Sequence, residues 1–243
     1  MKNLEHNRAR VVVRADDRSL TGHAGAVCVA EAVRALGMIE SIDGFVGPVK
    51  QRDRGLTAGE FVVSLAECLL AGGDYLSDLD GFRADTAAGA IRAVPVPPAS
   101  TTAATLARRF GPDELAGIEA AWVETTARAL ELAAPVERDR LVAQRPTIDL
   151  DSTEIEVFGR SKRGVAHNYL GQLAGRVLLA TWADAGVALA SDLMAGNDDP
   201  RPAAPDVIAA AIAGLPAGLE APRVRMDSGF FDRRIVEAVL ATG

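Results

Sequence analysis

Two short motifs carry aspartates in the setting where proteins commonly hold divalent metal. The first, at residues 148–153, reads IDLDST, and the second, at residues 224–229, reads VRMDSG. Each aspartate ends or interrupts a short apolar or β-prone run and is followed by small, turn-prone residues. Carboxylates at the ends of neighbouring strands are hard oxygen ligands of the kind that Mg²⁺ and Mn²⁺ prefer in phosphoryl-transfer sites. The motifs therefore predict metal-dependent chemistry on a phosphate ester.

Strand geometry decides which carboxylates can act together. Residues i and i+2 of a strand point to the same face, about 7 Å apart, so Asp149 and Asp151 share a face while Ile148 and Leu150 anchor the other. Asp227 follows a second strand-like run, and parallel sheets build their sites at the carboxyl ends of strands. We therefore predict a metal site formed by Asp151 and Asp227, with Asp149 as a further ligand.

The charge distribution points to a phosphate-bearing partner despite a net charge of −7. Residues 157–183 contain no Asp or Glu, but they contain Arg160, Lys162, Arg163 and Arg176. A local basic strip can contact phosphates even on an acidic protein. A solvated loop without a partner is the alternative for this strip.

Composition narrows the class of protein further. The chain has 243 residues, of which 49% are hydrophobic, enough for a substantial core. No apolar run has the length of a membrane span, and the N-terminus lacks the apolar stretch of a signal peptide. Cys28 and Cys68 lie in apolar helix-like segments, so we expect two buried free thiols in a reducing compartment. A disulfide or metal pair is the alternative.

The order of predicted elements divides the chain in two. Residues 1–134 form a mostly helical region, a candidate for DNA binding or dimerisation, and residues 135–243 hold strand, strand, strand, helix, strand, helix. The overall class is α/β in its second part and α+β as a whole, with a mixed sheet. The expected helices are 24–36, 56–71, about 76–82, 101–110, 114–133, 205–213 and a last one after Asp232; the expected strands are 11–13, 147–157, 177–182, 187–194 and 223–226.

Several blocks in this order resemble the DDE transposases of bacterial insertion sequences, the group 1 transposase DDE domain. Residues 147–153 (TIDLDST), 159–164 (GRSKRG) and 168–172 (NYLGQ) resemble that family's first catalytic block, and residues 225–231 (RMDSGFF) resemble its second. The segments LTGHAG at 20–25 and LLAGGDYLSDL at 69–79 resemble its helical N-terminal region. The likeness covers nearly the whole chain.

The resemblance implies a ribonuclease-H-like core and cut-and-paste DNA transposition. Asp151 matches the family's first acid better than Asp149 does, and Asp227 matches the second. The acids would hold two Mg²⁺ or Mn²⁺ ions, and the basic strip from Arg160 to Arg163 would contact DNA phosphates. The implied partners are the inverted-repeat ends of the element, target DNA and further copies of the chain. The implied place is the bacterial cytoplasm, at the nucleoid, with no membrane partner.

The chain departs from the family after its second acid. The third acid of the family lies on a later helix, and Glu237, ten positions after Asp227, comes too early to match it. We therefore expect a C-terminally truncated transposase core that does not cut DNA alone and forms the two-metal site only in a complete domain. Two alternatives stay open. One is an inactive repressor that binds DNA or its full-length relative. The other is a haloacid-dehalogenase-type phosphatase, with Asp149 as nucleophile and Asp151 as general acid.

Overall fold

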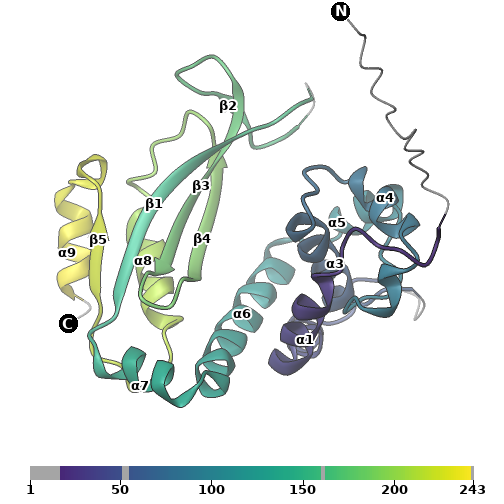
Figure 1. Cartoon of the computed structure of the whole chain (residues 1–243). Helices are drawn as coiled ribbons and strands as arrows, with labels where there is room; N and C mark the ends of the chain where they lie inside the picture. Colours follow the sequence, from purple (N-terminus) through teal and green to yellow (C-terminus); the bar gives the residue numbers. More distant parts are fainter. Residues whose placement is uncertain (1–16, 51–54, 160–161, 242–243) are drawn as a thin grey trace, which may run out of the picture. The chain divides into compact units, whose positions relative to one another are not determined.

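The computed structural model describes residues 17–50, 55–159 and 162–241, drawn in Figure 1. In these residues, mixed α and β structure confirms the predicted α+β class. The helices are α1 (Ala26–Leu36), α2 (Met38–Val46), α3 (Ala58–Leu70), α4 (Asp78–Ala84), η1 (Ala88–Ala90), α5 (Ser100–Ala107), α6 (Pro112–Leu132), α7 (Pro135–Ala143), α8 (Ala204–Ala213), η2 (Ser228–Phe230) and α9 (Arg233–Ala241). The strands are β1 (Thr147–Glu156), β2 (Ala166–His167), β3 (Leu173–Trp182), β4 (Val187–Ala195) and β5 (Arg223–Met226).

These elements form two compact units whose boundary differs from the predicted division at residue 134. Unit 1 takes the described residues up to Ala35 together with Pro48–Phe110, and unit 2 takes Leu36–Gly47 and Gly111–Gly243. Helices α2, α6 and α7 thus belong with the sheet. The reason is packing: α2 lies along α6, where Gly117 lets the backbone of Phe45 approach so closely that a Cβ at Gly117 would lie 2.9 Å from the Phe45 carbonyl oxygen.

Unit 1 is helical, as predicted. Helix α3 begins with a capping box in which the Thr57 hydroxyl accepts from the Glu60 N–H, while the Glu60 carboxylate accepts from the Thr57 N–H. Its core consists of apolar side chains from α3, α4 and α5, namely Phe61, Cys68, Leu79, Phe82, Ala103 and Leu106. Cys68 is a buried free thiol, as predicted. The prediction was wrong for Cys28, which is a free thiol but exposed, because the apolar stripe of α1 faces elsewhere and buries Ala30 and Val33.

A buried guanidinium lies inside unit 1. The side chain of Arg92 is fully buried, and its guanidinium carbon lies 3.6 Å from the centre of the Phe82 ring. The nearest Asp85 oxygen is 3.9 Å from Arg92, and burial lowers the pKa of the guanidinium. Asp85 also accepts hydrogen bonds from the Thr21 hydroxyl and the Ala88 N–H, and it pairs with Nδ1 of His23 at 3.1 Å. Opposite charges therefore compensate each other inside this small core.

The sheet of unit 2 has a mixed topology. Strands β1, β3 and β4 are antiparallel neighbours in the order β1-β3-β4, and β2 adds to β3 beyond the end of β4. After α8 the chain returns as β5, which pairs with β1 in parallel (Figure 1). The predicted hairpin of 177–182 and 187–194 is confirmed as β3 and β4, joined through the turn at Asp184-Ala185-Gly186. The predicted strand at 11–13 lies outside the described residues.

One face of this sheet carries the core of unit 2. Ile148 and Leu150 of β1 are 0% and 2% exposed. They pack with β3 and β4 residues and with helices α8 and α9, in a cluster of Leu141, Ile148, Leu150, Leu178, Ala180, Trp182, Leu189, Ala204, Val207, Ile208, Ala211, Phe230 and Ile235. Because side chains alternate along a strand, Asp149 and Asp151 must point to the opposite face. In the part of the chain that the structure describes, no helix is long and apolar enough to span a bilayer.

Candidate metal and DNA site

The pairing of β1 with β5 brings the two aspartate motifs together. Leu150 lies opposite Met226 in the parallel register, so Asp151 and Asp227 occupy the next position on each strand. Asp227 continues the strand direction, because its backbone is extended at φ −76° and ψ 174°. Neighbouring strands are about 4.8 Å apart. Asp151 and Asp227, which we predicted to act together, therefore lie side by side just beyond the last paired residues of β1 and β5. Both lie on the sheet face opposite the core.

Each of these aspartates is exposed and has one oxygen engaged by local backbone. Oδ1 of Asp151 accepts from the N–H of Ser152 at 2.7 Å, and Oδ1 of Asp227 accepts from the N–H of Gly229 at 2.9 Å. Asp227 thereby caps η2, whose Phe230 is buried in the core and fixes the turn. Among the described residues, no hydrogen bond or ion pair engages the second oxygen of either carboxylate. Carboxylate oxygens are ligands that Mg²⁺ accepts, with water or phosphate oxygens completing its coordination.

Asp149 forms an ion pair that the sequence did not predict. Its two carboxylate oxygens accept from Nε and Nη2 of Arg225, both at 2.6 Å, in a bidentate ion pair. Asp149 and Arg225 lie directly opposite each other on β1 and β5. The hydrogen bonds from Arg225 hold the pKa of Asp149 below its ordinary value. Arg225 engages one lone pair on each oxygen, so a cation at Asp149 would share the carboxylate with this ion pair. Its position clamps the two strands that carry Asp151 and Asp227.

The residues present fit part of a metal site. Among the described residues, no group of three or more His, Cys, Asp or Glu side chains is arranged to hold a metal ion. Mg²⁺ is often bound through one or two carboxylates, with waters and substrate phosphates as the other ligands. Asp151 and Asp227 satisfy that minimum for one ion, but they do not supply the ligands of two.

The predicted DNA-binding residues separate into two kinds. Lys162 and Arg163 are exposed in the segment before β2, whereas Arg160 lies outside the described residues. Arg176 is partly buried, with 18% of its side chain exposed. It donates to Glu154 at 2.5 Å and to the carbonyl oxygen of Asp198 at 2.7 Å. Arg176 therefore ties β3 to β1 and to the loop after β4, and is committed to the fold.

Sequence reasoning missed the residue that organises this end of the sheet. Asn168 is 7% exposed, and its Nδ2 donates to Glu154 at 2.6 Å while its Oδ1 accepts from two backbone N–H groups of the following turn. The available signal was the spacing of Asn168 and Gly171, which is typical of a tight turn. The partner Glu154 is fourteen positions away and depends on the strand register, which the sequence does not specify.

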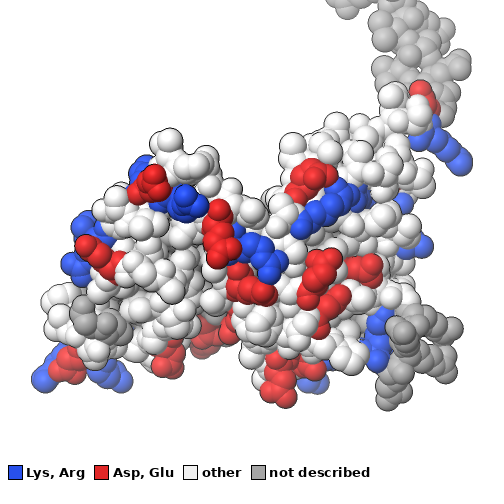
Figure 2. Space-filling view, turned by 90° about the horizontal axis from the view of Figure 1, so that it is seen from below, with Lys and Arg blue, Asp and Glu red and all other residues white. Residues whose placement is uncertain are grey.

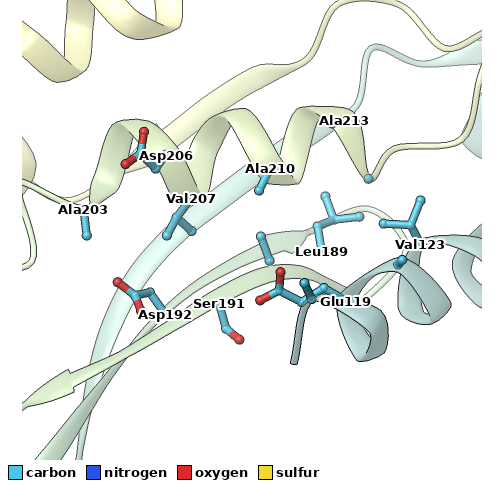
Figure 3. Close-up of a pocket in the computed structure, with 14 residues that line it drawn as sticks. Glu119, Val123, Leu189, Ser191, Asp192, Ala203, Asp206, Val207, Ala210 and Ala213 are labelled. Carbon is cyan, nitrogen blue, oxygen red and sulfur yellow. The ribbon is translucent and has the colours of Figure 1, made fainter. Parts of the chain in front are cut away.

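A hollow in unit 2 lies elsewhere, beside β4. It has a volume of about 460 Å³ and lies between α6, β4 and α8. Ala203, Val207 and Ala210 line it from the side of α8 that faces β4 (Figure 3). Neither Asp151 nor Asp227 lines this hollow. Both aspartates are exposed, so the metal candidate lies on the open surface of the sheet.

On the face seen in Figure 2, Lys and Arg side chains are interspersed with Asp and Glu side chains, and this view shows no broad patch of one sign. Comparisons of the chain with protein-family models, with curated proteins and with solved structures found no match.

Proposed function

We propose that this chain carries the first two acids of a DDE-type DNA strand-transfer site and belongs to the machinery that moves a bacterial insertion sequence. The observation that carries the proposal is the parallel register of β1 and β5, with Asp151 and Asp227 at neighbouring positions on the open face. The strand order supports it as well: three antiparallel strands, a helix, and a fourth strand parallel to the first match the start of a ribonuclease-H-like core. The cytoplasm, at the nucleoid, is the place that this function requires.

The proposed chemistry assigns a limited role to each residue. Asp151 and Asp227 hold the cation against the scissile phosphate, and the Asp149–Arg225 pair keeps their two strands in register. When bound, Mg²⁺ or Mn²⁺ lowers the pKa of the attacking water and neutralises charge on the phosphate. Lys162 and Arg163 contact the DNA backbone further along the strand. In this proposal the third acid and the second ion belong to a complete domain, and copies of that domain assemble on paired DNA ends.

Mn²⁺ binding tests the site directly. We expect electron paramagnetic resonance titration to show a weak Mn²⁺ site, and Asp151→Asn or Asp227→Asn to weaken it tenfold or more, since each removes one of two charged ligands. The matched control is Glu156→Gln, an exposed carboxylate on β1 that alternation directs to the other face. Equal Mn²⁺ affinity in wild type, Asp151→Asn and Asp227→Asn would remove the basis of the proposal.

A binding-only role is the second candidate. The absence of a three-carboxylate metal group among the described residues favours it. In that role the chain would occupy DNA ends or pair with a complete relative and repress transposition. A supercoiled-plasmid nicking assay with Mn²⁺ separates the two roles. Nicking that disappears in Asp151→Asn indicates an enzyme, and DNA binding without nicking indicates a repressor.

The phosphatase alternative has less support. It needs Asp149 as the nucleophile, with a free oxygen positioned for in-line attack. Both oxygens of Asp149 are held by Arg225 instead. In addition, β1 continues to Glu156, so Asp149 lies near the start of its strand and not at its carboxyl end.

A further inference from the structure

The turn between β2 and β3 holds an aromatic side chain out in solvent. Tyr169 is 85% exposed and its neighbour Leu170 is 64% exposed. An exposed tyrosine ring on a flexible loop is unremarkable, but this turn is braced on both sides. The N–H of Asn168 donates to the Gln172 carbonyl at 2.9 Å, and the N–H of Gly171 donates to the Asn168 carbonyl at 2.9 Å. Gly171 has φ +76°, a conformation that favours glycine.

A buried polar network supports the turn from below. The Asn168 side chain accepts from the N–H groups of Leu170 and Gln172 at 3.0 and 2.9 Å and donates to Glu154. Glu154 in turn accepts from Arg176, and both partners hold its pKa below the ordinary value. The turn is therefore fixed to β1 and β3. Such support reduces the entropy that the turn would lose on meeting a partner, which is a property of binding surfaces.

Two cations precede the turn in the sequence. From Lys162 to Leu173 the chain contains no Asp or Glu, and Lys162 and Arg163 are exposed. Aromatic side chains flanked by basic residues are how proteins hold unpaired nucleic acid, because rings stack on bases while cations contact phosphates. The exposed ring of Tyr169 and the two exposed cations favour a DNA strand.

The distance from the metal candidate follows from strand geometry. The N–H of Val157, the residue after β1, donates to the carbonyl of Leu173 at 2.8 Å. The turn before Leu173 therefore lies beyond the C-terminal end of β1. Six positions separate Asp151 from Val157, which is about 20 Å along a strand. Successive bases of one DNA strand are about 3.4 Å apart along the helix axis. A DNA strand that runs along β1 would therefore pass the turn about six nucleotides from a phosphate held at Asp151.

We propose that Tyr169, with Leu170 beside it, stacks on an unpaired DNA base about six nucleotides from the phosphate held at Asp151, while Lys162 and Arg163 contact the adjoining phosphates. The spacing rests on the proposed function, because it is counted from that site. The stacking itself rests on the exposure of Tyr169 and on the braced turn. The ligand is a DNA end that is single-stranded or distorted, in preference to an intact duplex.

Base-analogue fluorescence tests this contact. The probe is an oligonucleotide duplex with a short single-stranded end that contains 2-aminopurine, whose emission falls when it stacks. We expect the wild-type chain to quench the probe and Tyr169→Ala to lose most of the quenching, with affinity about tenfold weaker, in the range of one stacked base. Tyr169→Phe retains the ring and should keep both. A blunt duplex of the same sequence should bind wild type and Tyr169→Ala alike.

The matched control is Tyr75→Ala. Tyr75 is the second tyrosine of the chain, is 53% exposed and belongs to unit 1. Its loss should leave quenching unchanged. Equal losses from both tyrosine variants, or none from Tyr169→Ala, would overturn the proposal, as would a change in sedimentation of Tyr169→Ala without a change in DNA affinity, which would mark a protein interface. Circular dichroism of each variant confirms that the fold is kept.

Mn²⁺ titration separates failure of this inference from failure of the proposed function. Normal Mn²⁺ binding with no effect of Tyr169→Ala rejects the stacking contact alone. Loss of quenching in Tyr169→Ala, together with wild-type Mn²⁺ affinity in Asp151→Asn, supports the stacking but rejects the site from which its spacing is counted. Probes with 2-aminopurine at successive positions of the overhang then show how many nucleotides separate the quenched base from the strand break held at the metal site.

Discussion

The interior of unit 1 and the open sheet face of unit 2 use the same charged groups in opposite ways. In unit 1, Glu67 and Arg92 are buried, and Asp85 is mostly covered. In unit 2, Asp151 and Asp227 are exposed and engage only neighbouring backbone N–H groups. Burial commits a charge to its partner, because separation would leave it desolvated. Exposure leaves a carboxylate free to exchange water for a cation, which is the property that a metal site needs.

The largest effect that would break this comparison is expected at Glu67. Its carboxylate is 4% exposed and accepts from the N–H of Ala93 at 2.8 Å, close to the Arg92 guanidinium. Glu67→Gln keeps the size but leaves Arg92 with less compensating charge, so we expect a loss of about 3 kcal/mol in the free energy of unfolding. Urea unfolding followed by circular dichroism measures it. The exposed Glu31→Gln in unit 1 is the control, and an equal change in both would contradict the role of burial.

Acid should weaken unit 1 next. The Thr21 hydroxyl, then His23, the Ala88 N–H and Arg92 hold the pKa of Asp85 at about 2, against 3.8 in the unfolded chain. A carboxyl group whose pKa is lower in the folded protein stabilises the fold at pH values above its pKa in the unfolded chain. That contribution, about 2 kcal/mol, is lost as the pH falls from about 4 to 2. Asp85→Asn should flatten the pH dependence of unfolding over this window. An unchanged slope would show that Asp85 is not the group responsible.

A smaller effect should come from the ion pair on the sheet face. The side chains of Asp149 and Arg225 are 33% and 67% exposed, so solvent screens their attraction. Asp149→Asn should cost about 0.5 kcal/mol in chemical unfolding, followed by the emission of Trp122 and Trp182, which both lie in unit 2. The same variant sharpens the site assignment, because Mn²⁺ affinity should fall less than threefold. A tenfold fall would return Asp149 to the ligand set.

Local sequence signals predicted most elements because they act through near neighbours. The capping box of Thr57 and Glu60 and the turn between β3 and β4 are examples. Two helices were missed for a physical reason. Helix α2 begins after a glycine with positive φ at Gly37, which reads as a helix end. Helix α7 is mostly polar, and Leu141 is its one buried residue. Helix α7 therefore lacks the apolar periodicity by which helices are found.

The site was predictable in its residues but not in its partnerships. Alternation along β1 correctly put Asp149 and Asp151 on one face. Which of them is held by Arg225 depends on the register of β1 with β5, between residues 76 positions apart. The sequence likewise listed Arg176 among DNA contacts, although its pairing with Glu154 depends on the β1–β3 register. Long-range register thus separates structural charges from available ones.

The edge of the sheet has a consequence for how the protein behaves in a crowded solution. Among the described strands, β4 pairs with β3 alone, so its other side presents backbone groups to any extended chain nearby. The indole Nε1 of Trp122 in α6 donates to the Ala188 carbonyl at 2.6 Å and closes part of that edge. An open edge is a template for intermolecular β-pairing. A single tryptophan outside the sheet thereby shortens the stretch on which an aggregate can nucleate.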